Sequence, residues 1–283
     1  MSTVQVNFGL LGPLEIRRNG QVVSGPSGKK RSMLAMLLLH PEGTVTRDRL
    51  AGELWGDFPP PSAAANLRTH VSGLRSWLGK LFHDAAESEL VSTGTGWALN
   101  MTKCGEATTD VDRFEVDLAH GRKLADDGHL VDAEPLLRRA AMSCRGLPLQ
   151  DVPQGARLAA RAAVLTAQWL SGVEEYADVL IQLGSYEHAR IVLHELVGAH
   201  PTRERAWGQL MIACYRDGDL TAVVKAYRGA REALVEELGV EPSVEFTSLY
   251  QAILRRETAL EEIRPFRVVR PPVRRSVREP MTM

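Results

Sequence analysis

Cysteine is scarce in this sequence of 283 residues, which contains only Cys104, Cys144 and Cys214. No Cys-x-x-Cys pair is present, so a structural zinc site is not predicted. A sparse and odd cysteine count is typical of proteins that stay in a reducing cytosol. Long apolar runs are also missing, because the longest, residues 33–39, is far too short to span a bilayer. The N-terminus lacks a basic-then-apolar signal pattern. We therefore expect a cytoplasmic protein with no membrane partner.

Catalytic and cofactor motifs are absent as well. The Gly28-Lys29 pair is followed by Lys30, where a phosphate-binding P-loop requires Ser or Thr. The His194-Glu195 pair lacks the second histidine of a zinc protease helix, because position 198 is Gly. The eight histidines form no cluster. The sequence therefore predicts a protein that is not an enzyme and that holds no cofactor or metal.

The net charge of −1 conceals an uneven distribution of charge along the chain. Residues 1–103 contain 11 Lys and Arg against 8 Asp and Glu, a balance of +3. Residues 104–263 contain 17 against 26, a balance of −9, and residues 264–283 contain 6 against 1, a balance of +5. A basic front, an acidic middle and a basic tail indicate separate tasks for the three segments.

The most informative stretch is residues 62–78, which follow three consecutive prolines. Ser62 is a good N-cap, so a helix is predicted to begin there. Its apolar residues recur at i, i+4, i+7 and i+11 and form one buried stripe, Leu67, Val71, Leu74 and Leu78. Its opposite face carries hydroxyls and arginines and no acid, namely Arg68, Thr69, Ser72, Arg75 and Ser76. Such a face suits the phosphates and base edges of a DNA major groove, and the alternative is an ordinary solvated amphipathic helix.

The neighbouring segments favour the DNA-binding interpretation. Residues 4–23 contain an Asn19-Gly20 hairpin signal and predict a small antiparallel sheet. Helices are predicted over residues 29–39, 47–54 with Thr46 as N-cap, and 62–80, and residues 89–100 read as strand, Gly-rich turn and strand. Three short helices followed by a hairpin are typical of a winged helix-turn-helix, in which the third helix enters the major groove and the hairpin reaches the flanking backbone.

Three cations crowd the start of the first helix, Lys29, Lys30 and Arg31. Cations at a helix N-terminus oppose the helix dipole at a cost of about 0.3–1 kcal/mol each. One interpretation is exposed and screened charge with little consequence. The other is a phosphate clamp where the first helix crosses the DNA backbone.

The second half of the sequence predicts a helical array. Residues 184–193 and 218–227 align at an offset of 34, which is the tetratricopeptide period, and residues 128–133 resemble the start of a third, degenerate unit. Stacked helical repeats present a surface for a protein partner. The basic, Pro-rich residues 264–283 lack periodicity and predict disorder.

These motifs resemble the Streptomyces antibiotic regulatory protein family. Its OmpR-type DNA-binding domain is matched by the Lys30-Arg31 start of the first helix, the 67–75 helix and the 94–99 turn, and its bacterial transcriptional activation domain by Glu237–Ser243 and Leu249–Ile253. Gly73 and Thr93 stand where the family often has a basic residue. The resemblance implies a sequence-specific transcriptional activator of an antibiotic or secondary-metabolite gene cluster. It further implies binding to promoter direct repeats with a second protomer side by side on the DNA. It also implies recruitment of RNA polymerase holoenzyme through the sigma subunit and the alpha C-terminal domain.

The sequence thus predicts a mainly α protein with a small β component. An N-terminal winged helix-turn-helix at 1–105 is followed by a tetratricopeptide-like array at 106–263 and a disordered tail at 264–283. A fragment of residues 1–105 is expected to bind DNA by itself. The residues predicted to contact DNA are Lys29, Lys30, Arg31, Arg68, Thr69, His70, Ser72, Arg75, Ser76, Thr93 and Thr95. The alternative is a protein-interaction scaffold or a repressor that uses the winged helix. The predicted location is the cytoplasm, at the nucleoid.

Overall fold

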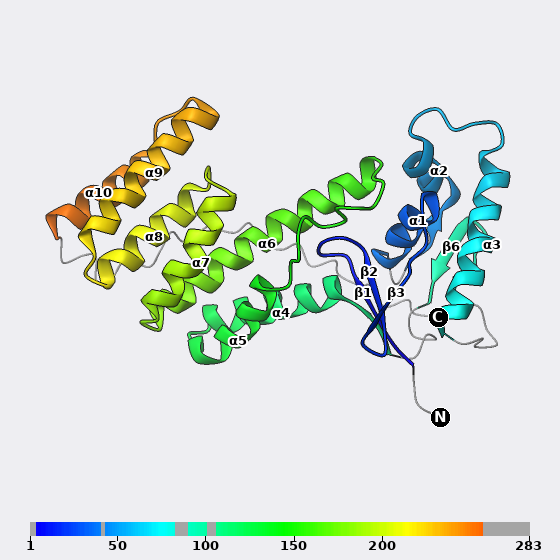
Figure 1. Cartoon of the computed structure of the whole chain (residues 1–283), viewed down its shortest axis with the longest axis horizontal. Helices are drawn as coiled ribbons and strands as arrows, with labels where there is room; N and C mark the ends of the chain where they lie inside the picture. The colour runs from blue at the N-terminus through cyan, green and yellow to red at the C-terminus, as the bar shows by residue number, and fades with distance from the viewer. Residues whose placement is uncertain (1–3, 41–42, 83–89, 101–105, 257–283) are drawn as a thin grey trace, which may run out of the picture. The chain divides into compact units, whose positions relative to one another are not determined.

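The computed structural model describes residues 4–40, 43–82, 90–100 and 106–256 (Figure 1). Its internal contacts divide the chain into two compact units, one ending at Gly184 and the other beginning at Ser185. The first unit holds all the strands and the helices α1 to α6, and the second holds the helices α7 to α10. The basic tail at 264–283 and Cys104 lie outside the described residues.

The chain opens with the predicted antiparallel strands β1 (Gln5–Gly9), β2 (Glu15–Arg18) and β3 (Gln21–Val23). The turn between β2 and β3 is Asn19-Gly20, and both residues have positive φ, 48° and 82°. Asn and Gly tolerate this left-handed backbone, which is why the pair marks a hairpin. Pairing of Phe8 with Ile16 places both side chains in the core.

A fourth strand, β7 (Glu106–Thr109), joins this sheet in parallel with β1, and the strand order is β3-β2-β1-β7. The sequence did not predict β7, because its partner lies about a hundred residues earlier and no local turn signals a parallel pair. The helical segment therefore starts with a strand that belongs to the N-terminal sheet, so residues 106–109 are part of the β component of the first unit.

The three helices of the winged helix-turn-helix are α1 (Lys29–Leu38), α2 (Arg47–Trp55) and α3 (Ala63–Phe82). The Thr46 hydroxyl accepts a hydrogen bond from the Arg49 backbone N–H at 3.3 Å, which confirms Thr46 as the N-cap of α2. Ser62 lies just before α3. Its carbonyl accepts a hydrogen bond from the backbone N–H of Asn66, and its hydroxyl accepts one from the Asn66 side-chain amide. The predicted stripe of α3 is buried, Leu67, Val71, Leu74 and Leu78.

The predicted wing is a second sheet of order β4-β6-β5, made of β4 (Val45–Thr46), β5 (Leu90–Ser92) and β6 (Gly96–Leu99). Its turn closes because the Thr93 N–H donates to the Gly96 carbonyl at 2.9 Å and the Gly96 N–H donates to the Thr93 hydroxyl at 3.1 Å. Gly96 also pairs with Thr46, and a Cβ at Gly96 would lie 2.0 Å from the Val45 carbonyl oxygen. Only glycine therefore allows β4 to approach β6.

Three further helices complete the first unit: α4 (Asp110–Asp126), α5 (Leu130–Ala141) and α6 (Ala156–Gln182). The Arg139 guanidinium donates two hydrogen bonds to the Asp117 carboxylate, at 2.8 and 3.0 Å, and thereby links α5 to α4. The predicted turn at Gly128 separates α4 from α5, and its φ of 85° requires the freedom of glycine.

The second unit contains α7 (Tyr186–Ala199), α8 (Glu204–Arg216), α9 (Leu220–Leu238) and α10 (Val244–Arg255). The helices α7 and α9 begin 34 residues apart, as the repeat alignment predicted, and the aligned Ala189 and Val223 are both fully buried. The ring of Tyr227 stacks on the rings of Phe246 and Tyr250, with centroids 5.6 and 4.0 Å apart, and fastens α10 to α9. The mainly helical fold with a small β component is thus confirmed.

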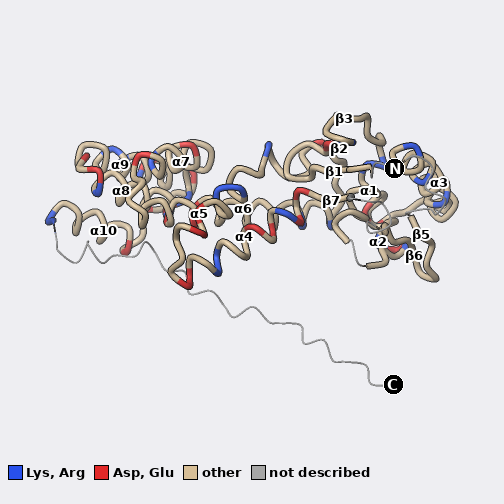
Figure 2. Tube along the Cα trace, turned by 90° about the horizontal axis from the view of Figure 1, so that it is seen from below, with Lys and Arg blue, Asp and Glu red and all other residues tan. Residues whose placement is uncertain are grey.

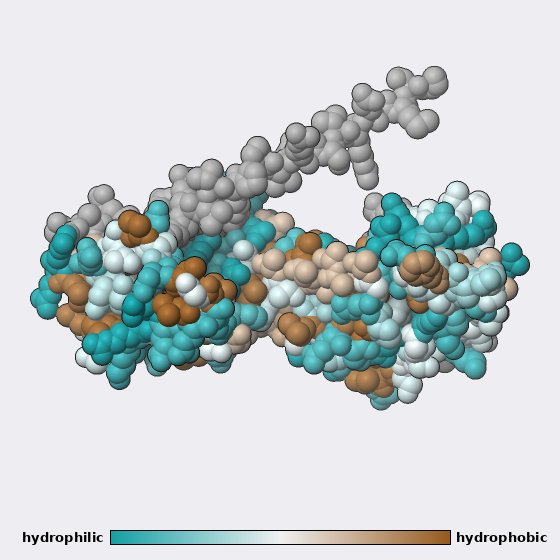
Figure 3. All heavy atoms as spheres, turned by 90° about the horizontal axis from the view of Figure 1, so that it is seen from above, coloured by the Kyte–Doolittle hydropathy of each residue, from teal (hydrophilic) through white to brown (hydrophobic). Residues whose placement is uncertain are grey.

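Some large apolar side chains remain exposed, among them Phe58 (91% exposed) and Val131 (75%). Figure 3 shows that hydrophobic residues lie in several separate patches on one face of the molecule. Within the described part of the chain, no helix is long and apolar enough to cross a membrane.

Replacing Gly96 by Ala is expected to destabilise the protein, because the added methyl group collides with the β4 backbone rather than with a movable side chain. Overpacking of this kind costs about 1–3 kcal/mol. Chemical denaturation of the full chain measures the loss. The matched control is Gly94→Ala in the same turn, where an added Cβ meets nothing within 4 Å. Equal stability of the two variants would contradict the tight β4–β6 approach.

Candidate nucleic-acid interface

The outer face of α3 carries the side chains that the sequence analysis selected for DNA. Arg68, Thr69, Ser72 and Ser76 are exposed, and the buried stripe of the same helix lies beneath them. The Thr69 hydroxyl donates to the Ala65 carbonyl of the preceding turn at 3.2 Å. The tube in Figure 2 carries Lys and Arg colour along α3. The helix therefore presents a polar, acid-free face at least two turns long.

A second group of residues joins α3 to the start of α1. The Lys29 ammonium lies 4.2 Å from the centroid of the Trp55 ring, a cation–π contact, and Trp55 stacks on His70 of α3 at 6.4 Å between centroids. Burial, followed by the charges of Lys29 and Lys30, lowers the pKa of His70 below its usual value. His70 therefore favours the neutral form and lies on the flank of α3 that faces α1.

Arg31 does not belong to this cationic group, in contrast to the predicted clamp of three cations. Its guanidinium donates to the Leu14 carbonyl at 2.8 Å and forms an ion pair with Asp151. Asp151 also accepts a hydrogen bond from the Leu14 N–H at 2.7 Å. Arg31 thus joins the segment before β2 to the loop before α6, which leaves Lys29 and Lys30 as the cations of the predicted clamp. The sequence does not reveal this role, because Asp151 lies 120 positions from Arg31.

On the opposite flank, Arg75 connects α3 to the wing. Its Nε donates to the Leu90 carbonyl at 2.9 Å, and its Nη2 donates to the Ser92 hydroxyl at 2.7 Å. Arg75 is half-buried and its position is set by β5. The Thr93 hydroxyl is engaged in closing the wing turn, whereas Thr95 is exposed at the tip. Arg75 and Thr93 therefore have structural partners, which the sequence analysis did not foresee.

Arg47, which the sequence analysis overlooked, lies beside these residues. Its guanidinium carbon is 5.8 Å from the centroid of the Trp97 ring, and the backbone N–H of Arg47 donates to the Thr95 carbonyl at 3.1 Å. Arg47, Arg68 and Arg75 line one groove of about 860 Å³ between α2, α3 and the wing. A signal was present in the sequence, since Arg47 is a cation at the first residue of a helix, as Lys29 is.

The winged helix is joined to α6 by a buried carboxylate. Glu53 of α2 is only 6% exposed, and its oxygens accept from the backbone N–H groups of Gly155 at 2.6 Å, Arg157 at 3.0 Å and Leu158 at 3.3 Å. The helix α6 has no acid in its first turn, and its N-cap is Gly155, which has no side chain. Glu53 therefore satisfies the free N–H groups and complements the dipole of a helix far away in the sequence.

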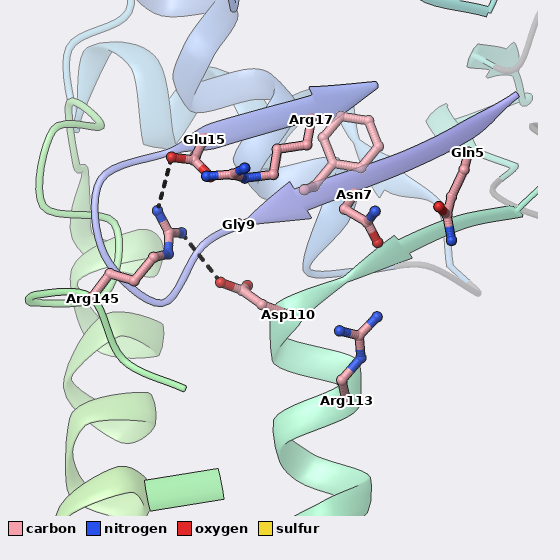
Figure 4. A pocket seen from close by; sticks show the side chains of 9 residues that line it. Gln5, Asn7, Gly9, Glu15, Arg17, Asp110, Arg113 and Arg145 are labelled. Atoms are coloured by element: carbon pink, nitrogen blue, oxygen red, sulfur yellow. Dashed lines mark hydrogen bonds and ion pairs between the residues drawn. The ribbon is translucent and has the colours of Figure 1, made fainter. Parts of the chain in front are cut away.

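A second joint links the N-terminal sheet to α4, as Figure 4 shows. The Asp110 carboxylate accepts from the N–H groups of Leu10 and Leu11 at 2.7 and 3.0 Å. Arg145 lies between Asp110 and Glu15, at 3.4 and 3.7 Å. Burial raises the pKa of Asp110, while the two N–H groups and Arg145 oppose that shift. Glu15, Asp110 and Arg145 line a cavity of about 400 Å³, and they pair with one another there.

These joints revise the expectation for a fragment of residues 1–105. A cut after residue 105 removes β7 from the sheet, and it also removes the partners of Arg31 and Glu53. The contacts of the structure divide the chain at Gly184, well inside the segment predicted to be the second domain. The isolated fragment is therefore not expected to keep the fold that it has in the full chain.

Two family models match the chain. "Transcriptional regulatory protein, C terminal" matches residues 20–96, and "Bacterial transcriptional activator domain" matches residues 109–254. Regulatory protein DnrI of Streptomyces peucetius is 32% identical over 93% of this chain and 96% of its own length. Regulatory protein AfsR of Streptomyces coelicolor is 34% identical over 91% of this chain, which corresponds to 25% of AfsR. A solved structure of Mycobacterium tuberculosis EmbR, in complex with a low-affinity phosphopeptide, has a TM-score of 0.80 and 28% identity, covering 92% of this chain and 68% of that chain.

The winged helix and the helical segment that follows it define a bacterial transcriptional regulator, and not an enzyme. The chain belongs to the Streptomyces antibiotic regulatory protein family of these regulators, as the sequence analysis predicted.

Replacing Glu53 by Gln is expected to lower the free energy of unfolding by about 1.5–3 kcal/mol, the usual range for hydrogen bonds to a charged group. The amide keeps the shape of the side chain but loses the charge and one acceptor. Gly155→Ala should have a similar effect, because its Cβ would lie 2.4 Å from the Glu53 carbonyl oxygen.

Denaturant unfolding of the full chain measures both losses. The control is Asp57→Asn, which removes an exposed acid just beyond the same helix. If Glu53→Gln proves no less stable than Asp57→Asn, the capping role of Glu53 is contradicted.

Proposed function

We propose that this regulator binds double-stranded promoter DNA sequence-specifically through α3 and activates transcription of an antibiotic or secondary-metabolite gene cluster. The observation that carries the proposal is the acid-free face of Arg68, Thr69, Ser72 and Ser76. Cations flank it on both sides: Lys29 and Lys30 at the start of α1, and Arg47 and Arg75 beside the wing. Arginines and hydroxyls read base edges, and the flanking cations neutralise phosphates.

The other residues predicted to contact DNA have different roles in this proposal. His70 lies at the edge of the face towards α1, and Thr95 at the wing tip reaches the flanking backbone. Thr93 contributes by closing the wing turn. Arg75 is held against the wing by its hydrogen bonds to Leu90 and Ser92, and its charge lies beside the phosphates that Arg47 contacts. Arg31 is not included. The site of action is the cytoplasm, at the nucleoid, because promoter DNA lies there.

Activation proceeds by recruitment of RNA polymerase holoenzyme, through the sigma subunit and the alpha C-terminal domain. Recruitment requires only a favourable coupling between DNA binding and polymerase binding, and a coupling of about 1–3 kcal/mol corresponds to roughly 5–150-fold. The operator consists of direct repeats, and a second protomer binds side by side in head-to-tail order. The exposed apolar side chains of the protein, Phe58 above all, are candidates for the polymerase contact.

Selection of bound sites from random duplex DNA defines the operator, and footprinting with purified polymerase then tests the function. Protection of direct repeats together with increased transcript supports an activator. Protection with reduced transcript indicates a repressor, and a lack of protection indicates an interaction scaffold. Either of these two results overturns the proposal.

Arg68→Ala is expected to weaken operator binding. If the guanidinium reads a guanine, the loss is about 1–3 kcal/mol and specificity relaxes at one base pair. Fluorescence anisotropy on the operator and its single-base variants measures both effects. Arg228→Ala is the matched control, an exposed arginine on α9 of the second unit. Equal affinities of wild type and Arg68→Ala for every duplex would remove α3 from the recognition role.

Phe58→Ala is expected to reduce transcription at saturating operator occupancy while operator affinity stays unchanged. The ring is 91% exposed in the loop between α2 and α3, so its removal costs the fold little. Transcription with purified polymerase and anisotropy on the same preparation separate the two activities. Val131→Ala, on the exposed side of α5, provides the comparison. Full activation by Phe58→Ala would exclude this ring from the polymerase contact.

A further inference from the structure

Gly73 lies in the middle of α3, where glycine is a poor choice for the helix. Glycine in a helix interior costs about 1 kcal/mol relative to alanine. Its φ is not in the left-handed region, so the backbone does not require it. Its presence therefore needs a reason in what lies beside it.

The side chain of Lys30 lies against Gly73. A Cβ at position 73 would be 3.3 Å from Lys30 Cδ and 3.7 Å from Lys30 Nζ. The first distance is shorter than an ordinary van der Waals contact, and the second puts the ammonium itself beside the α3 backbone. The stem of Lys30 thus crosses from α1 to α3 through the space that a side chain at position 73 would fill.

The two neighbours of Lys30 in the sequence have other partners. Lys29 lies over the Trp55 ring, and Arg31 is paired with Asp151. Lys30 is the member of this trio whose side chain lies against the backbone of α3 at Gly73. On a helix, residues three and four positions away are surface neighbours, so Thr69 and Ser76 flank Gly73. Both are exposed residues of the proposed DNA-reading face.

We propose that the Lys30 side chain crosses α3 at Gly73 and contacts a DNA phosphate beside the bases read by α3. Gly73 is then a positioning residue, since it leaves room for the lysine stem. This inference rests on the proposed DNA binding and assigns one contact of it to a pair of residues on two different helices. The size of the residue at position 73 would thereby determine whether Lys30 reaches the operator.

The charge is tested by Lys30→Met, which keeps the stem and removes the ammonium. Losing one phosphate contact should reduce the slope of log K against log salt by about 0.9, or roughly fivefold in affinity at 0.15 M salt. Lys225→Met, an exposed lysine of α9, should leave the slope unchanged. A wild-type slope in Lys30→Met overturns the inference.

The path of the stem is tested by Gly73→Leu, in which a good helix former fills the space of Lys30. It should lose about as much affinity as Lys30→Met and show the same reduced slope, while thermal unfolding shows that the helix is intact. The double variant should bind like Lys30→Met alone, because both changes remove the same contact. Additive losses would mean that the two positions act on DNA separately, and would overturn the pairing.

The wild-type protein separates this inference from the proposed function. If the wild-type protein binds no selected operator, DNA binding itself is refuted. If the wild-type protein binds and the variants bind equally well, only this inference is refuted.

Discussion

The buried carboxylate of Glu53 at the N-terminus of α6 is the constraint that organises the first unit. A carboxylate removed from water is costly unless its oxygens are hydrogen-bonded, and the first N–H groups of a helix are costly unless they find acceptors. Each group satisfies the other here, so neither α2 nor α6 is complete alone. Ser32 reinforces the joint by donating to the Pro153 carbonyl at 2.6 Å. The winged helix and the beginning of the activator segment therefore belong to one compact unit.

This arrangement has a consequence for how a DNA-bound regulator presents itself to a partner. The helix α2 packs against α3 and carries Glu53, so α3 and α6 are separated by a single intervening helix. The proposed docking of α3 in a major groove would therefore also orient α4, α5 and α6, because all of them belong to the same compact unit. A partner that contacts these helices would meet a preorganised surface, which favours binding by reducing the entropy lost on association.

The sequence predicted the local features of the molecule and missed the distant ones. The predicted local features depend on residues that are close together in the sequence, so the sequence pattern indicates them directly. They are the hairpin at Asn19-Gly20, the Thr46 cap and the buried stripe of α3. The strand β7 pairs with β1 about a hundred positions earlier, and the ion pair between Arg31 and Asp151 spans a similar separation. No local sequence pattern predicts either of them. The same holds for Arg75, whose hydrogen bonds to the wing became evident only from the fold.

Glu53 is an intermediate case, because the sequence contains a local signal for it although its partner is distant. It is an acid three residues after the buried Leu50 and therefore lies on the apolar side of α2. A charged residue on that side calls for a partner, and the acid-poor start of α6 is such a partner. Arg47 is a similar case, since it is a cation at the first residue of α2, as Lys29 is at the first residue of α1.

The central claim, that the exposed face of α3 lies in the major groove, is tested most directly by cleavage of DNA from that face. An iron chelate attached to cysteine in Ser72→Cys, in the full chain bound to its selected operator, generates hydroxyl radicals close to the point of attachment. The account predicts strand cleavage within each protected repeat, above the background from wild type and from a chelate placed on α5 at Val131→Cys. Cleavage from the α5 position alone, or cleavage only outside the repeats, would contradict the account.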